Sequence, residues 1–405
     1  MNVAVSFGPI AKCTVFMRRV AILTASILCI VAATVQSVRG AGTTIDAHAL
    51  TGKVFFIREL WGGDSPQTRG RRFISVINAN GSGSSVILEE FDRVSSLIWY
   101  PMLNSLGVST TSTKTLLDRN PHPPNAINGM YTVEINGTSA ESVSVGSVKH
   151  TLPDDFPTHF YDPMWENKNG RNTLIPNSKG YMTRVTLSPD GKWVAGIASN
   201  IISASQGFTL KLCVVAANGM TPRKCALSVT PHEALSPVWS PNGTKIVFSG
   251  CLKENAFPEC NLTELFIADA DMKGVIQLTN ISGPKIDDKV GIVEPGMKMD
   301  VWHKSSHPVW SPDGGWIAFM SYGGIYRVHP DGKALQLIIP NGSFPTWSPD
   351  GTMLMYVLRA GHQFDPSGPS DRIFVAHADG SDQTEIPLDY QSPGRYTYSD
   401  LNWAE

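Results

Sequence analysis

A five-residue motif occurs four times between residues 187 and 351. It reads Trp-Ser-Pro-Asp-Gly or a close variant, and its copies occupy residues 187–191, 239–243, 310–314 and 347–351. The motif favours a tight reversal, because proline presets φ, Asp or Asn bonds its own backbone, and glycine accepts a positive φ. An apolar run such as 245–248 follows each copy. We therefore predict that each motif is the hairpin between strands A and B of a repeated unit.

A second marker completes the repeated unit. After each B strand and a variable loop comes an apolar run that closes on a turn, usually Asn-Gly or Asp-Gly, and a further short apolar run follows. These closing runs occupy residues 74–81, 131–137, 212–219, 265–271, 325–332 and 373–380. We interpret the two runs as strands C and D. Four-stranded antiparallel units with a period of about 40 to 50 residues are typical of β-propeller blades.

The count of inner strands predicts how the ring closes. In blades 2 to 6 strand A ends at Trp99, Leu187, Trp239, Trp310 and Trp347, whereas blade 1 begins directly with its B strand at 53–60. Residues 399–405 have the pattern of a sixth A strand. We therefore predict an all-β, six-bladed β-propeller in which this last strand completes blade 1, so that the ring has no free edge.

The first 40 residues have the order of a signal peptide. Two arginines at 18–19 precede an apolar run over 20–35, and small or polar residues follow. We expect cleavage after Ser37 or Gly40, and Met17 would serve as the start of an ordinary signal peptide. The alternative is an uncleaved anchor, for which the apolar run is short. We expect residues 41–405 to be a single propeller domain, periplasmic or secreted, with no membrane span after cleavage.

The Trp-Ser-Pro-Asp-Gly form and its downstream Asp-Gly turn resemble the repeat of the TolB-like β-propeller family. The likeness covers residues 53–403 and implies a six-bladed propeller on the extracytoplasmic side. TolB carries an α/β domain ahead of its propeller and helps to connect the bacterial envelope through the peptidoglycan-associated lipoprotein. Here the first blade begins soon after the targeting segment, so we expect that α/β domain to be absent.

Four cysteines remain after residue 40, and an even number in an exported chain favours disulfides. Cys213 and Cys225 are symmetric about Gly219, which predicts a cross-strand pair on strands C and D of blade 3. Cys251 and Cys260 bracket a loop in blade 4, and we predict a second disulfide there. Neither spacing is the two-residue gap of a zinc knuckle, which disfavours a zinc site.

The long connections predict which face of the propeller binds a ligand. They are all B–C or D–A loops, which leave a propeller on the face where the inner strands begin, and they span 61–72, 102–129, 149–180, 250–264, 281–306 and 359–372. Function usually lies in loops held by a rigid scaffold, although neutral drift is the alternative. In five of the six inner strands, a polar residue stands three positions before the residue that ends the strand. In the remaining strand this position holds Phe344. We predict that the five polar residues bind a ligand at the channel mouth: Ser96, Arg184, Ser236, His307 and Asp400.

Composition and motifs narrow the function. A net charge of −2 and no long basic stretch argue against nucleic-acid binding. The chain has no Gly-x-Ser-x-Gly, phosphate loop or dinucleotide fingerprint. We predict a monomeric binding module, without a cofactor, that docks a protein, peptide or glycan on the long-loop face.

The alternative is a carbohydrate-active enzyme, a glycan lyase or hydrolase with a His/carboxylate centre on the same face. The densest group of this kind is 300–307, where imidazoles and a carboxylate could also hold a divalent metal. His307 takes the place that Ser236 and Phe344 hold in neighbouring blades, so we assign no metal ligand and no catalytic residue. A divalent cation bound on the channel axis by backbone oxygens would leave no mark in the sequence.

Overall fold

The chain separates into two units, residues 1–44 and 45–405. The computed structural model describes parts of the second unit, namely 45–61, 71–88, 94–110, 129–150, 165–168, 171–174, 182–203, 207–218, 224–226, 230–231, 237–251, 263–281, 305–321, 323–359, 370–388 and 395–405. The predicted signal peptide lies outside these ranges. No helix within them is long and apolar enough to cross a membrane.

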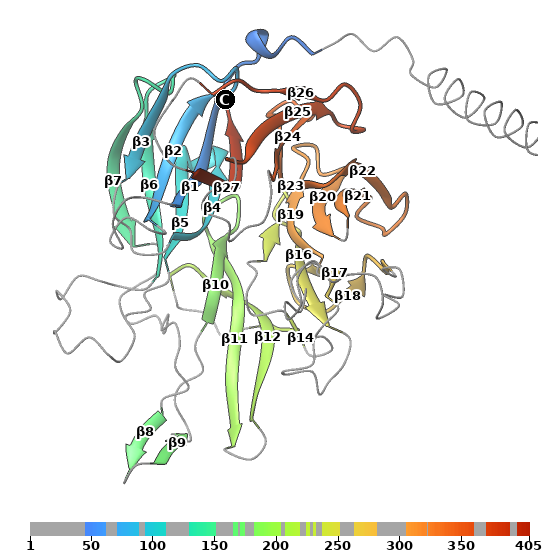
Figure 1. The fold of residues 1–405 in the computed structure, drawn as a ribbon. Helices are drawn as coiled ribbons and strands as arrows, with labels where there is room; N and C mark the ends of the chain where they lie inside the picture. The colour runs from blue at the N-terminus through green and yellow to red at the C-terminus, as the bar shows by residue number, and fades with distance from the viewer. Residues whose placement is uncertain are drawn as a thin grey trace, which may run out of the picture. The chain divides into compact units, whose positions relative to one another are not determined.

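Six antiparallel sheets form the blades of a propeller (Figure 1). Blade 1 contains, from the inner strand outward, β27 (Arg395–Ala404), β1 (Lys53–Trp61), β2 (Arg71–Asn78) and β3 (Ser84–Leu88). Blade 2 contains β4 (Val94–Tyr100), β5 (Ser105–Thr110), β6 (Gly129–Asn136) and β7 (Ser144–His150). Blade 3 contains β10 (Met182–Leu187), β11 (Trp193–Ser203), β12 (Gly207–Ala216) and β13 (Lys224–Cys225).

The other three blades follow the same order. In blade 4, β14 (Thr230–Pro231) and β15 (Val238–Trp239) both pair with β16 (Lys245–Cys251), which is followed by β17 (Glu264–Asp269) and β18 (Val275–Gln277). Blade 5 contains β19 (Ser306–Trp310), β20 (Ile317–Ser321), β21 (Gly324–Val328) and β22 (Gln336–Pro340). Blade 6 contains β23 (Gly342–Trp347), β24 (Met353–Leu358), β25 (Arg372–His377) and β26 (Thr384–Glu385). Two single-turn 3-10 helices are η1 (Ala47–Ala49) and η2 (Pro101–Leu103).

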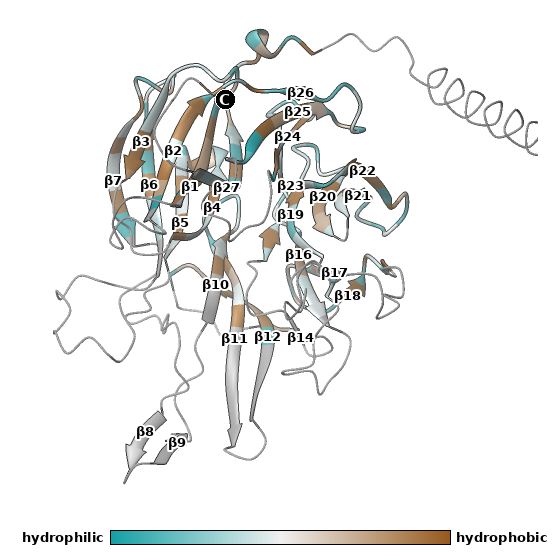
Figure 2. Cartoon of the chain, in the orientation of Figure 1, coloured by the Kyte–Doolittle hydropathy of each residue, from teal (hydrophilic) through white to brown (hydrophobic). Residues whose placement is uncertain are grey.

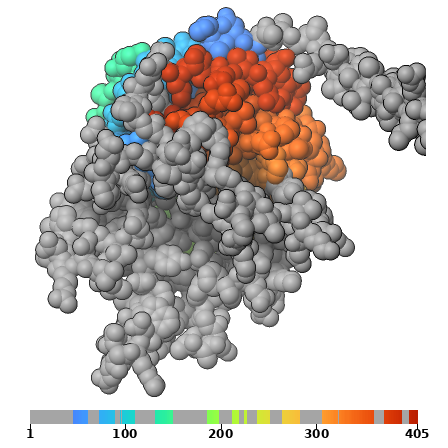
Figure 3. Space-filling view, in the orientation of Figure 1, coloured from blue at the N-terminus to red at the C-terminus, as the bar shows by residue number. Residues whose placement is uncertain are grey.

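The predicted closure of the ring is confirmed. β27 pairs antiparallel with β1 from Lys53 opposite Ala404 to Trp61 opposite Arg395. In the space-filling view the blue residues near the start of the described chain lie beside the red residues near its end (Figure 3). The last strand therefore supplies the inner strand that blade 1 would otherwise lack.

The core lies between the blades and explains the apolar B strands. Alternate residues of a strand face opposite sides, so Val54 and Phe56 of β1 pack toward blade 6 while Phe55 and Ile57 pack toward blade 2. Six such buried clusters fill the six boundaries between blades, and the strands accordingly carry the brown, apolar stretches in Figure 2. Strands buried on both faces read as continuous apolar runs rather than alternating ones.

Two of the predicted long loops contain strands, so these loop predictions are wrong. The segment 102–129 includes β5, whose Leu106 and Val108 are fully buried against blade 1. Its sequence, Ser-Leu-Gly-Val-Ser-Thr, offers two aliphatic side chains separated by glycine, which is a weak strand signal. The segment 149–180 includes a two-stranded ribbon of β8 (Trp165–Lys168) and β9 (Arg171–Leu174).

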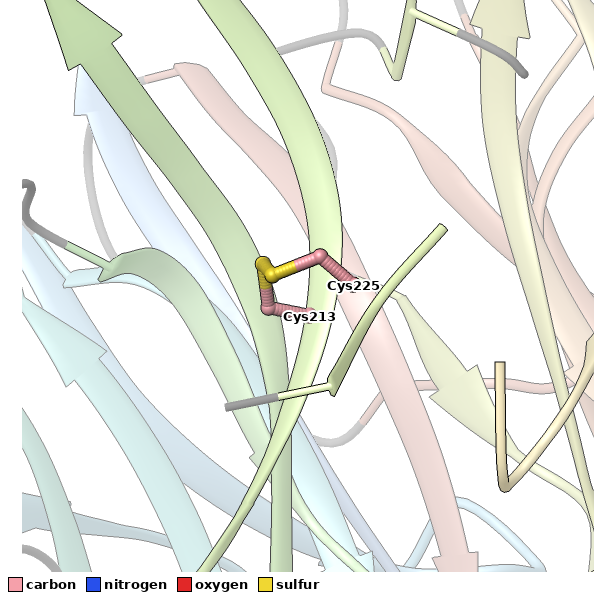
Figure 4. Close-up of a disulfide and its surroundings, with 2 residues drawn as sticks. All are labelled: Cys213 and Cys225. Atoms are coloured by element: carbon pink, nitrogen blue, oxygen red, sulfur yellow. A yellow bond between two sulfur atoms is a disulfide. The ribbon is translucent and has the colours of Figure 1, made fainter. Parts of the chain in front are cut away.

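The disulfide predicted in blade 3 is present. Cys213 on β12 lies directly opposite Cys225 on β13, and the sulfur atoms are bonded at 2.07 Å (Figure 4). Cys251 is the last residue of β16, while Cys260 lies outside the described ranges. The second disulfide stays a prediction.

Candidate functional site: the central channel

The inner strands of all six blades line one channel with a volume of about 640 Å³. These strands occupy the same place in their blades and run in the same direction, so the two ends of the channel are built from different parts of the repeat. The bulge mouth lies where the strands begin, and its lining residues are Ser96, His307, Phe344 and Asp400. The turn mouth lies at the A–B turns, and its lining residues are Pro101, Met102, Pro189, Pro241, Pro312, Pro349 and Glu405.

Three neighbouring inner strands carry a left-handed residue at the bulge mouth. The φ angle is 50° at His307, 51° at Phe344 and 50° at Asp400. Each sits in a β-bulge, where the pairing of the inner strand with strand B shifts register. The left-handed conformation costs an L-residue about 1–2 kcal/mol, which glycine avoids, yet none of the three is glycine. Backbone strain of this kind is concentrated at functional sites.

The side chains at these bulges contact one another across the boundary between blades 5 and 6. The rings of His307 and Phe344 meet edge to face, with centroids 4.8 Å apart. The guanidinium of Arg359 lies 5.4 Å from the centroid of the same Phe344 ring, a cation–π distance. His307 Nδ1 is 3.1 Å from Ser306 Oγ. The bulge mouth and its border therefore combine an imidazole, an aromatic ring, a guanidinium and a carboxylate from three consecutive blades.

The structure brings three of the five predicted site residues together. Ser96, His307 and Asp400 line the bulge mouth, and the Ser96 hydroxyl is buried with no hydrogen-bond partner among the residues described. Arg184 belongs to β10. Its side chain and the whole of Ser236 lie outside the part of the chain that the structure describes. The sequence analysis did not single out Arg359. Its position directly after strand β24 could have indicated that it lies near the bulge mouth.

The A–B turns of blades 2 to 6 surround the turn mouth, and blade 1 presents Glu405 there. In blades 4 to 6 the turn glycine faces the turn proline of the preceding blade, so that a Cβ built on Gly351 would lie 3.4 Å from Pro312 Cδ. The corresponding distances are 3.9 Å from Gly314 to Pro241 and 3.8 Å from Gly243 to Pro189. Prolines therefore stand around the channel in a fixed order, one from each of blades 2 to 6.

Each Ser-Pro-Asp-Gly turn is held by its own side chains. In blade 6 the Ser348 hydroxyl donates to Asp350 Oδ1 at 2.6 Å and accepts the Met353 N–H at 2.9 Å. The serine hydrogen bond is the main cause that holds the pKa of the turn aspartate below its usual range, in Asp350 and in the equivalent Asp190 and Asp313. In blade 4 the neutral Asn242 makes the same turn, accepting from Ser240 Oγ at 2.8 Å.

The tryptophans of the motif join neighbouring blades. Their indole N–H groups donate to carbonyl oxygens on the inner strand of the preceding blade: Trp239 to Thr186 at 3.2 Å, Trp310 to Val238 at 3.4 Å and Trp347 to Val309 at 3.2 Å. In blade 1 the Trp403 indole donates to the Thr51 carbonyl at 3.0 Å. These side chains therefore stabilise the ring, and their N–H groups are already used.

The structure brings no cluster of metal-binding side chains together within the described ranges, where no three His, Cys, Asp or Glu residues are placed to share an ion. Of the candidate group 300–307, residues 305–307 are described and the others are not.

Comparison with known proteins supports the fold. No protein-family model matches the chain. Among curated proteins, an uncharacterised peptidase from Bacillus subtilis, YuxL, is 26% identical over 170 residues, which cover 38% of this chain and 24% of YuxL. The chain thus spans about a quarter of the length of the curated relative that it matches.

A solved structure of TolB is similar to this chain in fold. TolB from Acinetobacter baumannii superposes with a TM-score of 0.51 at 14% identity, over 87% of this chain and 66% of that one. A structure described as TolB from Agrobacterium tumefaciens gives a TM-score of 0.43 at 16% identity, over 88% of this chain and 99% of that one. The superposition with the Acinetobacter protein shows that the chain is similar in fold to TolB-like β-propellers.

Proposed function

We propose that the protein is a binding module that holds a peptide segment of a partner protein at the bulge mouth of its channel. The proposal depends on one observation: His307, Phe344 and Asp400 sit in left-handed bulges at the same end of the channel. A purely structural strand would avoid the cost of three such residues by using glycine. The strain is consistent with selection of these side chains for contact with a ligand.

The chemistry of the bulge mouth suits a peptide. Its ring and imidazole offer apolar contact, while the Asp400 carboxylate offers an acceptor for backbone amides. Ligand sites typically combine an apolar lining with a few placed polar groups in this way. The channel is also a concave site in a rigid scaffold, so little ordering would be needed on binding.

We further propose that the protein works in the periplasm or outside the cell. The support is the disulfide between Cys213 and Cys225, because such bonds persist in oxidising compartments. The signal-peptide order of residues 1–40 points the same way.

The test is a selection of random linear peptides displayed on phage, with wild-type protein as bait and the His307→Ala/Asp400→Ala double variant as counter-screen. We expect to select peptides whose affinity falls at least about tenfold in His307→Ala alone and in Asp400→Ala alone. This loss corresponds to roughly 1.4 kcal/mol of binding free energy. The matched control is Asp331→Ala, an exposed turn residue on the opposite face, which should leave affinity unchanged. Peptides that depend on Asp331 and not on His307 or Asp400 would contradict the proposal.

A second arm separates binding from catalysis. A panel of polysaccharides is incubated with the wild-type protein, with and without added divalent cations, and the products are measured by mass spectrometry. Absence of cleavage products from every polysaccharide agrees with the proposal of a peptide-binding module. Cleavage that is lost in His307→Ala would replace it with the carbohydrate-active alternative.

A further inference from the structure

An amide group of the chain itself fills a hydrogen-bonding slot in the channel wall of blade 2. The slot consists of two backbone groups of β4, the Leu97 carbonyl and the Trp99 N–H. The side-chain amide of Asn402, from blade 1, accepts from the Trp99 N–H at 2.9 Å and donates to the Leu97 carbonyl at 3.2 Å. All three residues line the cavity. The slot therefore binds a group that offers one donor and one acceptor, as an amide does.

An equivalent slot exists in blade 5. Hydrogen-bonded pairs alternate along an antiparallel ladder, and the Ser311 N–H donates to the Trp316 carbonyl at 2.9 Å. Trp310, one residue earlier, is therefore not bonded to β20, whereas Val309 is. The carbonyl of Pro308, directly before Val309, and the N–H of Trp310, directly after it, consequently point away from β20 and toward the channel.

Blade 6 repeats this arrangement. The Ser348 N–H donates to the Met353 carbonyl at 2.9 Å, so the same alternation turns the Pro345 carbonyl and the Trp347 N–H away from β24. Both of these residues, like their counterparts in blade 5, line the cavity. Two neighbouring blades thus present the same pair of backbone groups to the channel.

The slots of blades 5 and 6 are open because valine stands where blade 1 has Asn402. The corresponding residues, each directly before the last residue of its inner strand, are Val238 in blade 4 and Val309 in blade 5. Their side chains pack at the boundary with the next blade, but valine has no polar atom to offer the neighbouring slot. Within the described part of the chain, no hydrogen bond reaches the four backbone groups of these two slots.

The slots of the other blades are filled at least in part by side chains. The Leu187 N–H of blade 3 donates to a tyrosine hydroxyl at 3.0 Å, and the Trp403 N–H of blade 1 donates to Thr346 Oγ1 at 3.1 Å. In blade 4 the Thr186 hydroxyl donates to a proline carbonyl at 3.0 Å. Among the inner strands as the structure describes them, blades 5 and 6 are the two that leave both groups of the slot open.

We propose that the open slots of blades 5 and 6 bind backbone amide groups of a peptide that enters the channel from the bulge mouth. The chemical class follows from Asn402, whose amide already occupies the equivalent slot. His307 directly precedes Pro308, and Phe344 directly precedes Pro345, so a peptide that contacts the bulges has its next amides beside the slots. Such main-chain hydrogen bonds add affinity without selecting side chains. The inference deepens the proposed function and rests on it for the peptide as ligand.

The experiment uses the full chain labelled with ¹⁵N-tryptophan, because NMR then observes the slot N–H groups directly. The chain has 10 tryptophans, and the backbone signals of Trp310 and Trp347 are assigned as those lost in Trp310→Phe and Trp347→Phe. The probe is N-acetylglycine N-methylamide, a neutral molecule with two peptide groups. We expect a dissociation constant on the order of 10 mM for a ligand of this size. The Trp310 and Trp347 signals should shift, whereas those of Trp99 and Trp403, whose N–H groups are already bonded, should not.

Asparagine substitutions fill the open slots one at a time. Val238→Asn gives the Trp310 slot an amide of the chain's own, as blade 1 does for blade 2, so the probe should shift Trp347 and no longer Trp310. Val309→Asn should give the reverse result. The matched controls are Val238→Ile and Val309→Ile, which add no polar atom and should leave both shifts unchanged. Isoleucine already holds this position in blade 2, as Ile98. The unchanged signals of the other tryptophans show that each variant is folded.

A second probe tests whether both groups of a slot take part. Methyl acetoxyacetate has an ester oxygen in place of each N–H, so it keeps the acceptors of the first probe without the donors. We expect it to bind at least about threefold more weakly.

Four results would overturn the proposal. They are no shift with the amide probe, which would mean that water alone fills the slots, equal affinity for the ester, shifts of Trp99 and Trp403 as large as those of Trp310 and Trp347, or shifts that survive in the asparagine variants. The probe has no side chain to contact His307 or Asp400, so failure here leaves the phage selection to decide the proposed function separately.

Discussion

Asn402 in β27 hydrogen-bonds to the backbone of Trp99 and so fastens blade 1 to blade 2. The Trp99 N–H donates to Asn402 Oδ1 at 2.9 Å, and the Asn402 amide nitrogen donates to the Leu97 carbonyl at 3.2 Å. One side chain thus bonds with the neighbouring inner strand through both of its polar atoms. The ring is closed by this contact as well as by the pairing of β27 with β1.

Asn402→Ala should destabilise the ring by about 1–3 kcal/mol, because the Trp99 N–H is left without its acceptor. The measurement is the free energy of unfolding in urea at neutral pH. Asn280→Ala is the control, since this asparagine is exposed, and it should change stability by less than about 0.5 kcal/mol. Equal stability of the two variants would show that the Asn402 contact contributes nothing to closure.

Trp403→Ala should cost more, about 3–5 kcal/mol, because it removes a buried indole from the boundary of blades 6 and 1. It also removes the hydrogen bond to the Thr51 carbonyl. Trp403→Phe keeps most of the packing and loses that bond, so we expect a smaller loss of about 1 kcal/mol. Thermal unfolding, monitored by circular dichroism, compares the stabilities of the two variants. A Phe variant as unstable as the Ala variant would contradict the prediction.

The turn aspartates make stability depend on pH. The pKa of Asp350 is lower in the folded chain than its usual value, chiefly because Ser348 donates a hydrogen bond to it. A carboxylate of this kind contributes stability above its unfolded pKa and loses that contribution as pH falls through the folded pKa. Asp350→Asn should therefore lose less stability than wild type on acidification below about pH 4. Unfolding curves at neutral and acid pH test this, and parallel losses would refute it.

The disulfide of blade 3 closes a short loop, with a sequence separation of 12 residues. Replacing both cysteines, as Cys213→Ala/Cys225→Ala, should lower stability by about 3 kcal/mol on the chain-entropy model. Calorimetry checks the magnitude against wild type. An unchanged melting temperature would show that the strands β12 and β13 hold without the bond.

Peptide mapping without reduction examines the second pair. It should recover the Cys213–Cys225 bond and also the predicted Cys251–Cys260 bond. Free thiols at Cys251 and Cys260 would contradict the latter.

The parts of the fold that the sequence predicted are those in which local signals and burial agree. The Ser-Pro-Asp-Gly motifs predicted the A–B hairpins because the proline, the aspartate and the glycine each favour the conformation of a tight turn. β5 escaped detection because its buried face consists of Leu106 and Val108 between small residues. The position of His307 and Asp400 at the channel was predicted from their offset before the motif, whereas their left-handed backbone was not. Neither residue type requires a positive φ, so the bulge depends on tertiary packing.

The bond from Trp403 to Thr51 spans 352 residues of chain, and this separation sets a condition on folding during synthesis. At about 5–20 residues per second a ribosome needs roughly 20 to 70 s to cover that distance. Throughout this time β1 has no inner neighbour, and its unpaired edge is a template for association with other chains. This edge stays open to such association until the last strand arrives.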